Sequence, residues 1–244
     1  MVWTSRANLN TARAELAGGG GPDDAICMGG EISGSPYVSA VTEEYNGTAW
    51  SAGGNLGTAR RAPSGGGTSS GAICMGGEGA NGYLATTEEY NGTAWSAGGA
   101  INTARKYMGG GGNASNAICM GGFYYEEEPE EITYIYDDTE EYNGTAWSSG
   151  GNLGTARYYL AGGGTASEAV CFGGFSGSPL AVTEVYDGSA WSSSDNMNTA
   201  RYYLAGGGVP AGAIGMGGTT GSFSVATETF TSAPPVPRTM VIWF

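Results

Sequence analysis

Apolar and polar positions recur along this chain with a period of about 45 residues, most legibly as TEEYNGTAWSAGGNLGTARRAPSGGGTSSGAICMGG over residues 42–77. In five copies a Trp precedes an Arg by ten positions, and the Arg precedes the second glycine of a Gly-Gly pair by seventeen. The repeated positions are Trp3, Trp50, Trp95, Trp147 and Trp191, followed by Gly30, Gly77, Gly122, Gly174 and Gly218. Such a period predicts that each copy is one supersecondary unit of a repeat fold.

Variation in length between the copies falls in one segment of the unit. The gap from the Gly-Gly pair to the next Thr-Glu is 12, 10, 17, 9 and 9 residues in the five copies. We therefore expect one variable loop per unit, at a place where a repeat protein changes length without disturbing its stack.

The pattern within each unit predicts four short β-strands. A glycine-rich strand follows the Arg, as at 158–164 in the fourth copy, and Ala-Ile-Cys-Met-Gly-Gly is typical of a strand buried on both faces. Thr-Glu-Glu-Tyr is the third strand, and Asn-Gly or Asp-Gly then predicts a hairpin turn into a fourth strand that carries the Trp. Four antiparallel strands repeated radially make a β-propeller, so we expect an all-β fold.

These strand signals also resemble those of a known family. A double glycine closes the second strand, and a Tyr on the third strand precedes the Trp by five positions in four copies, at Tyr45, Tyr90, Tyr142 and Tyr186. In this spacing the chain resembles kelch-repeat proteins over nearly its whole length. The resemblance implies a propeller of four-stranded blades packed face to face.

The two ends of the chain predict five blades. The chain opens on the strand of Trp3 with no third strand before it, and the last Thr-Glu-x-aromatic segment, 227–230, has no Trp five residues later. We expect the N-terminal strand at 2–6 to pair into the C-terminal blade and close the ring, with 239–244 as the alternative closing strand. The expected divisions are one propeller over 1–232, with repeats at about 7–52, 53–97, 98–149, 150–193 and 194–232, and a Pro-rich joint with an aromatic tail over 233–244.

One Arg and one Glu recur in all five copies. Because side chains alternate along a strand, this Glu shares its face with the recurring Tyr or Phe, on the packed side between blades. A buried carboxylate needs a partner, so we expect structural ion pairs; the alternative is a ring of Arg on one face that binds anionic groups. The predicted residues are Arg13, Arg60, Arg105, Arg157 and Arg201 with Glu43, Glu88, Glu140, Glu184 and Glu228.

Composition and charge limit the class of partner. Glycine contributes 47 of 244 residues, which suits a linker, but 15 Tyr and 6 Trp, many at fixed spacing, favour a folded core. The net charge is −14 with a single Lys, which disfavours nucleic acid because a phosphate backbone needs a cationic footprint. No apolar run reaches the ~18 residues of a membrane span, and MVWTSRANLN lacks the layout of a secretory signal. We expect synthesis in a cytoplasm and no membrane insertion.

Few residues are available for catalytic or metal chemistry. The chain contains no histidine, which removes His metal ligands, Ser-His and Cys-His nucleophiles and the commonest general base. Four copies carry a Cys at one equivalent position, at Cys27, Cys74, Cys119 and Cys171. We expect these to be small buried hydrophobic side chains, with a four-thiolate metal ring near the axis as the alternative. The prediction is therefore no catalytic residue, no cofactor, no metal and no enzyme.

The longest variable segment, 123–138, holds the main acidic cluster, with seven acids between Glu126 and Asp138. Contiguous acids repel one another, which favours a solvated or partner-binding hairpin over the converging carboxylates of a glycosidase or a calcium site. Interleaved Tyr residues alternate as strand residues do, which suggests an extended hairpin arm. The candidate partner-binding residues are Tyr124, Tyr125, Glu126, Glu127, Glu128, Glu130, Glu131, Tyr134 and Tyr136, together with Trp243 and Phe244 of the tail.

We therefore expect a non-enzymatic propeller whose function is binding or assembly. The Asn-Gly-Thr-Ala-Trp-Ser and Asn-Leu-x-Thr-Ala-Arg segments are similar to those of kelch-like repeat proteins of marine bacteriophages. That resemblance implies a virion component, such as a capsid decoration or tail appendage, whose partners are other virion proteins or a host-surface glycan or protein. A homo-oligomer, or several copies in an assembly, stays open. The alternatives are a lectin with pockets lined by Tyr and Trp, and a cytoplasmic interaction scaffold.

Overall fold

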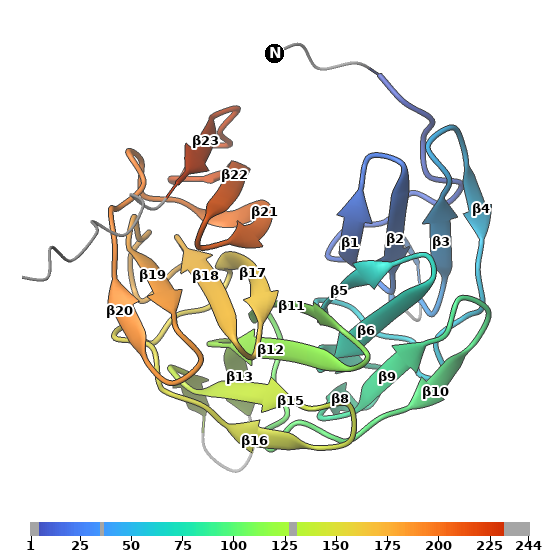
Figure 1. Cartoon of the computed structure of the whole chain (residues 1–244), viewed down its shortest axis with the longest axis horizontal. Helices are drawn as coiled ribbons and strands as arrows, with labels where there is room; N and C mark the ends of the chain where they lie inside the picture. The colour runs from blue at the N-terminus through green and yellow to red at the C-terminus, as the bar shows by residue number, and fades with distance from the viewer. Residues whose placement is uncertain (1–4, 35–36, 127–130, 232–244) are drawn as a thin grey trace, which may run out of the picture.

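The structure, a computed structural model, describes residues 5–34, 37–126 and 131–231. These residues form five antiparallel sheets arranged as the blades of a β-propeller, and they contain no helix (Figure 1). The first blade consists of β1 (Ala17–Gly21), β2 (Asp24–Met28), β3 (Thr42–Tyr45) and β4 (Trp50–Ala52). The second consists of β5 (Ser64–Thr68), β6 (Gly71–Met75), β9 (Thr87–Tyr90) and β10 (Trp95–Ala97). The fold class predicted from the repeat is confirmed.

The remaining blades repeat this order from the axis outward. The third blade consists of β11 (Gly109–Asn113), β12 (Asn116–Met120), β15 (Thr139–Tyr142) and β16 (Trp147–Ser149). The fourth consists of β17 (Ala161–Thr165), β18 (Glu168–Phe172), β19 (Thr183–Tyr186) and β20 (Trp191–Ser193). The fifth consists, in the described chain, of β21 (Tyr202–Val209), β22 (Gly212–Thr219) and β23 (Thr227–Phe230).

Two small hairpins extend the loops between the second and third strands of a blade. They are β7 (Glu78–Gly79) with β8 (Gly82–Tyr83) in the second blade, and β13 (Phe123–Glu126) with β14 (Ile132–Ile135) in the third. The acidic insertion is thus a hairpin, as its alternating Tyr residues suggested.

In the fourth blade the innermost strand starts later than the glycine-rich pattern predicts. The expected strand was 158–164, but β17 begins at Ala161, whereas β21 of the fifth blade begins at Tyr202. Tyr159 has a φ of +56°, a left-handed conformation that interrupts the strand before Ala161. From there the glycines lie against those of the next blade: a Cβ on Gly66 would meet the carbonyl oxygen of Gly112 at 2.8 Å. Only glycine allows the innermost strands to approach so closely.

Neighbouring blades share apolar cores. Ile73 and Met75 of β6 pack against Cys119 and Tyr142 of the third blade, and all four side chains are buried. The same pattern joins the first blade to the second, the third to the fourth and the fourth to the fifth. Burial of the strand faces against the next blade therefore stabilises the stack of blades.

Each recurring Arg forms an ion pair with the recurring Glu of its own blade. The N–O distances are 3.0 Å for Arg13–Glu43, 2.6 Å for Arg60–Glu88, 2.7 Å for Arg105–Glu140 and 2.8 Å for Arg201–Glu228, and Arg157 pairs with Glu184. All five Arg side chains are 0% exposed. Their guanidinium groups are therefore out of reach of an anion in solvent.

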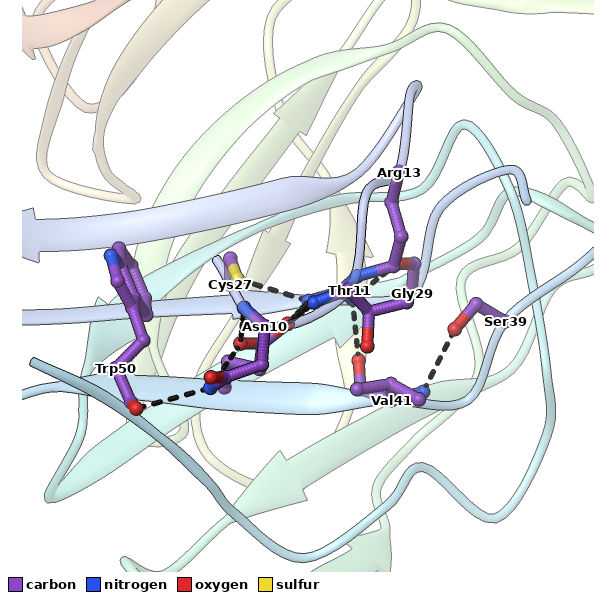
Figure 2. Close-up of polar contacts among 9 residues, drawn as sticks. Asn10, Thr11, Arg13, Cys27, Gly29, Ser39, Val41 and Trp50 are labelled. Atoms are coloured by element: carbon purple, nitrogen blue, oxygen red, sulfur yellow. Dashed lines mark hydrogen bonds and ion pairs between the residues drawn. The ribbon is translucent and has the colours of Figure 1, made fainter. Parts of the chain in front are cut away.

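The pair in the first blade shows why these charges are tolerated inside (Figure 2). Arg13 Nη1 donates hydrogen bonds to the carbonyl oxygens of Gly29 (2.6 Å) and Val41 (2.7 Å). Glu43 accepts the backbone N–H groups of Asn10 and Thr11 at 2.7 and 3.2 Å. Burial alone would raise the pKa of Glu43, but these hydrogen bonds and that from Arg13 hold it below its usual value. The pair anchors the segment that enters the blade.

Two further hydrogen bonds recur between blades. The indole N–H groups of Trp95, Trp147 and Trp191 each donate to a Thr of the preceding blade, as from Trp95 to Thr42 Oγ1 at 2.8 Å. The hydroxyls of Tyr90, Tyr142 and Tyr186 each donate to the Glu at the variable position of the preceding blade, namely Glu44, Glu89 and Glu141. Between the fourth and fifth blades the equivalent residues are Val185 and Phe230, which pack in one apolar cluster. Val185 therefore offers no acceptor, and Phe230 has no hydroxyl group that would need one.

Among the described residues, the ring is open between the fifth and first blades (Figure 1). β1, β5, β11, β17 and β21 pack in succession, whereas β21 makes no comparable contact with β1. Thr227 is accordingly exposed, although the equivalent Thr42 is buried, and the buried hydroxyl of Tyr45 has no hydrogen-bond partner. The predicted closing strand at 2–6 falls mostly outside the described residues, and Ser5 and Arg6 lie in no strand. The alternative closing segment, 239–244, lies outside them entirely.

Candidate functional site

The residue two positions after each recurring Arg lies at the propeller axis. These residues are Glu15, Ala62, Tyr107, Tyr159 and Tyr203, and all have φ between +49° and +58°. From the second blade on, the backbone N–H of this residue donates to the carbonyl oxygen of the equivalent residue in the preceding blade, at 2.9 Å for Ala62, 3.3 Å for Tyr107, 3.0 Å for Tyr159 and 3.1 Å for Tyr203. This ladder compensates a left-handed conformation that is unfavourable for residues other than glycine.

The five side chains line one end of the central opening, which we call the axial mouth. It encloses a cavity of about 340 Å³ whose wall also includes the apolar side chains of Leu16, Met108, Leu160 and Leu204. The rings of Tyr159 and Tyr203 have centroids 3.6 Å apart, and those of Tyr107 and Tyr159 are 4.2 Å apart. The Tyr107 hydroxyl donates to Glu15 Oε1 at 3.1 Å. The mouth therefore combines three closely packed, mutually tilted phenol rings with one carboxyl group.

The phenols of the axial mouth are held in their protonated form. Burial raises the pKa of Tyr107, Tyr159 and Tyr203, and the negative charge of Glu15 raises those of Tyr107 and Tyr203 further. Neutral phenols cannot act as bases near neutral pH. Their rings and hydroxyl donors are what the mouth offers to a ligand.

An aromatic belt extends outward from the mouth over the third, fourth and fifth blades. Its members are Phe123, Tyr158, Phe175 and Tyr202, with successive ring centroids 4.9, 5.7 and 5.0 Å apart. Tyr158 connects the belt to Tyr159 of the mouth, at 4.5 Å. Backbone bridges pair Lys106 with Phe123 and Tyr158 with Phe175, which places the mouth and the variable loops on one face of the propeller, the loop face.

Charged groups occupy the other part of the loop face. Arg61 is held by Glu31 at 2.9 Å and by Glu78 at 3.0 Å. Lys106 Nζ bonds Glu78 and lies 4.9 Å from the ring centroid of Tyr107. Both basic groups are therefore already paired with carboxylates: Arg61 with Glu31 of the preceding blade and Glu78 of its own, and Lys106 with Glu78 of the preceding blade.

The hairpin of the third blade places the predicted partner-binding residues beside this face. Tyr124 lies 4.8 Å from Tyr83 and 6.2 Å from Tyr134, between ring centroids, and Tyr134 is 49% exposed. Tyr136 lies under the guanidinium of Arg105, at 5.2 Å, so it covers a structural residue. Tyr125 and Glu126 lie on β13, and Glu131 is exposed. The remaining predicted residues, Glu127, Glu128, Glu130, Trp243 and Phe244, lie outside the described residues.

The sequence pattern did not predict the axial mouth. Tyr107, Tyr159 and Tyr203 were treated as part of a glycine-rich strand, and no role was given to Glu15. The available signal was positional: in three of five copies the second residue after the Arg is Tyr. A strand pattern does not predict the left-handed conformation that brings these side chains to the axis.

The repeated Cys residues lie apart from the mouth. All four are free and buried, each on the second strand of its blade. Burial raises the pKa of Cys74, Cys119 and Cys171 to about 12, so these thiols stay protonated. Within 5–34, 37–126 and 131–231, no three Cys, Asp or Glu residues are grouped closely enough to hold a metal ion. No described helix is long and apolar enough to cross a membrane.

Comparisons with known proteins add no family to this description. No protein-family model matches the chain, and no curated protein sequence matches it either. The loop face, with its aromatic belt and axial mouth, is thus the observation on which a function can be argued.

Proposed function

We propose that this protein is a non-enzymatic binding propeller that holds its partner on the loop face. The observation that carries the proposal is the continuous set of aromatic rings from Phe123 to Tyr203, which ends in a cavity lined by Tyr and one Glu. Tyr side chains are favoured in binding surfaces because they give a large rigid contact area and a hydrogen-bonding hydroxyl. The absence of histidine and the protonated thiols and phenols also support binding over catalysis.

We further propose, from the resemblance of the repeats to kelch-like phage proteins, that the protein is a virion component. The rigid stack of blades suits a part that carries a binding face on a particle. The test is fractionation of purified phage particles on a density gradient followed by mass spectrometry. The proposal expects the chain to sediment with capsid or tail proteins. Recovery only in the soluble fraction of the lysate would reject a virion role.

A lectin is the second candidate, because the aromatic belt offers ring faces on which sugars stack. A glycan array probed with the intact protein tests it. Binding that is lost when Tyr202 and Tyr203 are replaced by Ser, and kept when the hairpin residue Tyr134 is replaced by Ser, would identify the belt as a sugar site. Absence of glycan binding, together with recovery in particles, favours a protein partner.

A further inference from the structure

We propose that the axial mouth binds the ammonium group of an organic cation. The ligand class includes free quaternary amines and the ammonium-bearing side chain of a partner. The inference rests on the proposed function in one respect, namely that the loop face is the binding face. It adds the chemistry that the mouth recognises.

Glu15 supplies the first argument. Its Oε1 accepts the hydroxyl of Tyr107, whereas its Oε2 is shielded from solvent and has no hydrogen-bond partner. A shielded oxygen without a donor is costly, so a ligand that supplies positive charge or an N–H group there is favoured. An anionic ligand would instead meet this carboxyl group and a protein of net charge −14.

The aromatic rings supply the second argument. Ammonium groups are attracted to the faces of aromatic rings, and sites for quaternary amines are built from several rings around a small cavity. Tyr107, Tyr159 and Tyr203 surround a cavity of about 340 Å³ with Leu16, Met108 and Leu204 in its wall. An apolar wall suits the methyl or methylene groups that surround the charge.

The basic residues nearby do not serve as the occupant. Arg61 is held by Glu31 and Glu78, and Lys106 bonds Glu78 from outside the mouth. Lys106 does show that the ring of Tyr107 already lies within cation–π distance of an ammonium group, at 4.9 Å. Neither basic residue donates a hydrogen bond to Glu15 Oε2, which has no hydrogen-bond partner.

The test is titration of the full chain with choline, followed by calorimetry and by the proton resonance of its trimethylammonium group. We expect saturable binding and an upfield ring-current shift of that resonance. The neutral isostere 3,3-dimethylbutan-1-ol should bind at least tenfold more weakly, because it lacks only the charge that an aromatic ring face attracts. Nα-acetyl-lysine amide, titrated in parallel, distinguishes a side-chain ammonium from a quaternary amine as the preferred source.

Three variants place the site. Glu15→Gln keeps an acceptor for Tyr107 but removes the charge, and should weaken choline binding about tenfold. Tyr203→Ala should abolish most of the ring-current shift. Tyr134→Ala is the matched control, since Tyr134 and Tyr203 are both 49% exposed, and it should bind choline as the original protein does.

Equal binding of choline and its neutral isostere, or an unchanged affinity in Glu15→Gln with a normal circular dichroism spectrum, would overturn the inference. An unchanged affinity in Glu15→Gln would mean that choline is attracted only by the net negative charge of the whole protein. These results would leave the proposed function standing if the protein still sediments with particles. Choline binding by a protein that never enters particles would reject the virion role and keep the cation site.

Discussion

The hydroxyl of Tyr107, which precedes the third blade, donates a hydrogen bond of 3.1 Å to Glu15 Oε1, which precedes the first. Tyr107 also follows Ala62 in the backbone ladder of the axial mouth. The side chain therefore joins two blades that are not neighbours in the ring. It fixes the carboxyl group of Glu15 at the edge of the cavity.

Replacing Tyr107 by Phe should remove this bond and the hydrogen bond between the Tyr107 and Tyr159 hydroxyls. We expect a loss of about 1 to 2 kcal/mol in the free energy of unfolding, at about 1 kcal/mol for each hydrogen bond. Urea denaturation followed by Trp fluorescence measures it. Tyr134→Phe, on the exposed hairpin, is the control. A Tyr107→Phe protein as stable as the original would show that the bond does not hold the mouth together.

The buried ion pairs should differ in strength according to their place in the ring. Glu140 is 4% exposed in its pair with Arg105, whereas Glu228, beside the open seam, is 16% exposed in its pair with Arg201. Glu140→Gln leaves the buried guanidinium of Arg105 with only the half-exposed carboxylate of Asp138, at 4.0 Å, as a counter-charge, and should cost about 3 kcal/mol of unfolding free energy. Glu228→Gln should cost clearly less. Equal losses in thermal and urea denaturation would contradict this ranking.

The exchange of Tyr and Glu for Phe and Val between the fourth and fifth blades can be reversed. Val185→Glu alone should destabilise the protein, because the carboxyl group would face the ring of Phe230 without a donor. Adding Phe230→Tyr should supply the missing donor and create, between positions 230 and 185, the equivalent of the hydrogen bond from Tyr186 to Glu141 one blade earlier. A double-mutant cycle should give a coupling of about 1 kcal/mol or more. Additive effects of the two changes would show that these positions do not meet.

The open seam should make one Cys more reactive than the others. Cys74, Cys119 and Cys171 lie in cores between blades, whereas Cys27 belongs to the first blade, which has no blade packed before it. We expect a thiol reagent to label Cys27 first and the other three only at the rate of unfolding, with peptide mass spectrometry to locate the label. Labelling of all four at one rate would indicate a closed ring.

Much of this fold was predictable because the determinants repeat. The fixed spacing of Trp, Arg and Gly-Gly indicated the blades, and Asn46 Oδ1 caps the predicted turn by accepting the N–H groups of Thr48 and Ala49. The Arg and Glu positions could be matched because both recur in every copy, and the structure places them together as buried pairs.

The candidate site was less visible because its chemistry does not repeat. Glu15 and Ala62 stand where other copies have Tyr, and a φ near +50° leaves no periodic pattern in the sequence. The Tyr–Glu bonds join residues about one repeat apart, as Tyr90 and Glu44 show. These partners meet only when neighbouring blades pack together, so the pattern within one repeat does not predict the bonds.

The central claim is that the loop face, and not the opposite face with its Asn-Gly turns, contacts the partner. Tyrosine footprinting by mass spectrometry, on purified particles and on the free protein, tests it most directly. We predict protection of Tyr202 and Tyr203 in the particle, with the turn at Asn143 and Gly144 showing no change in hydrogen exchange. Protection at the turns with Tyr203 unchanged would contradict the account.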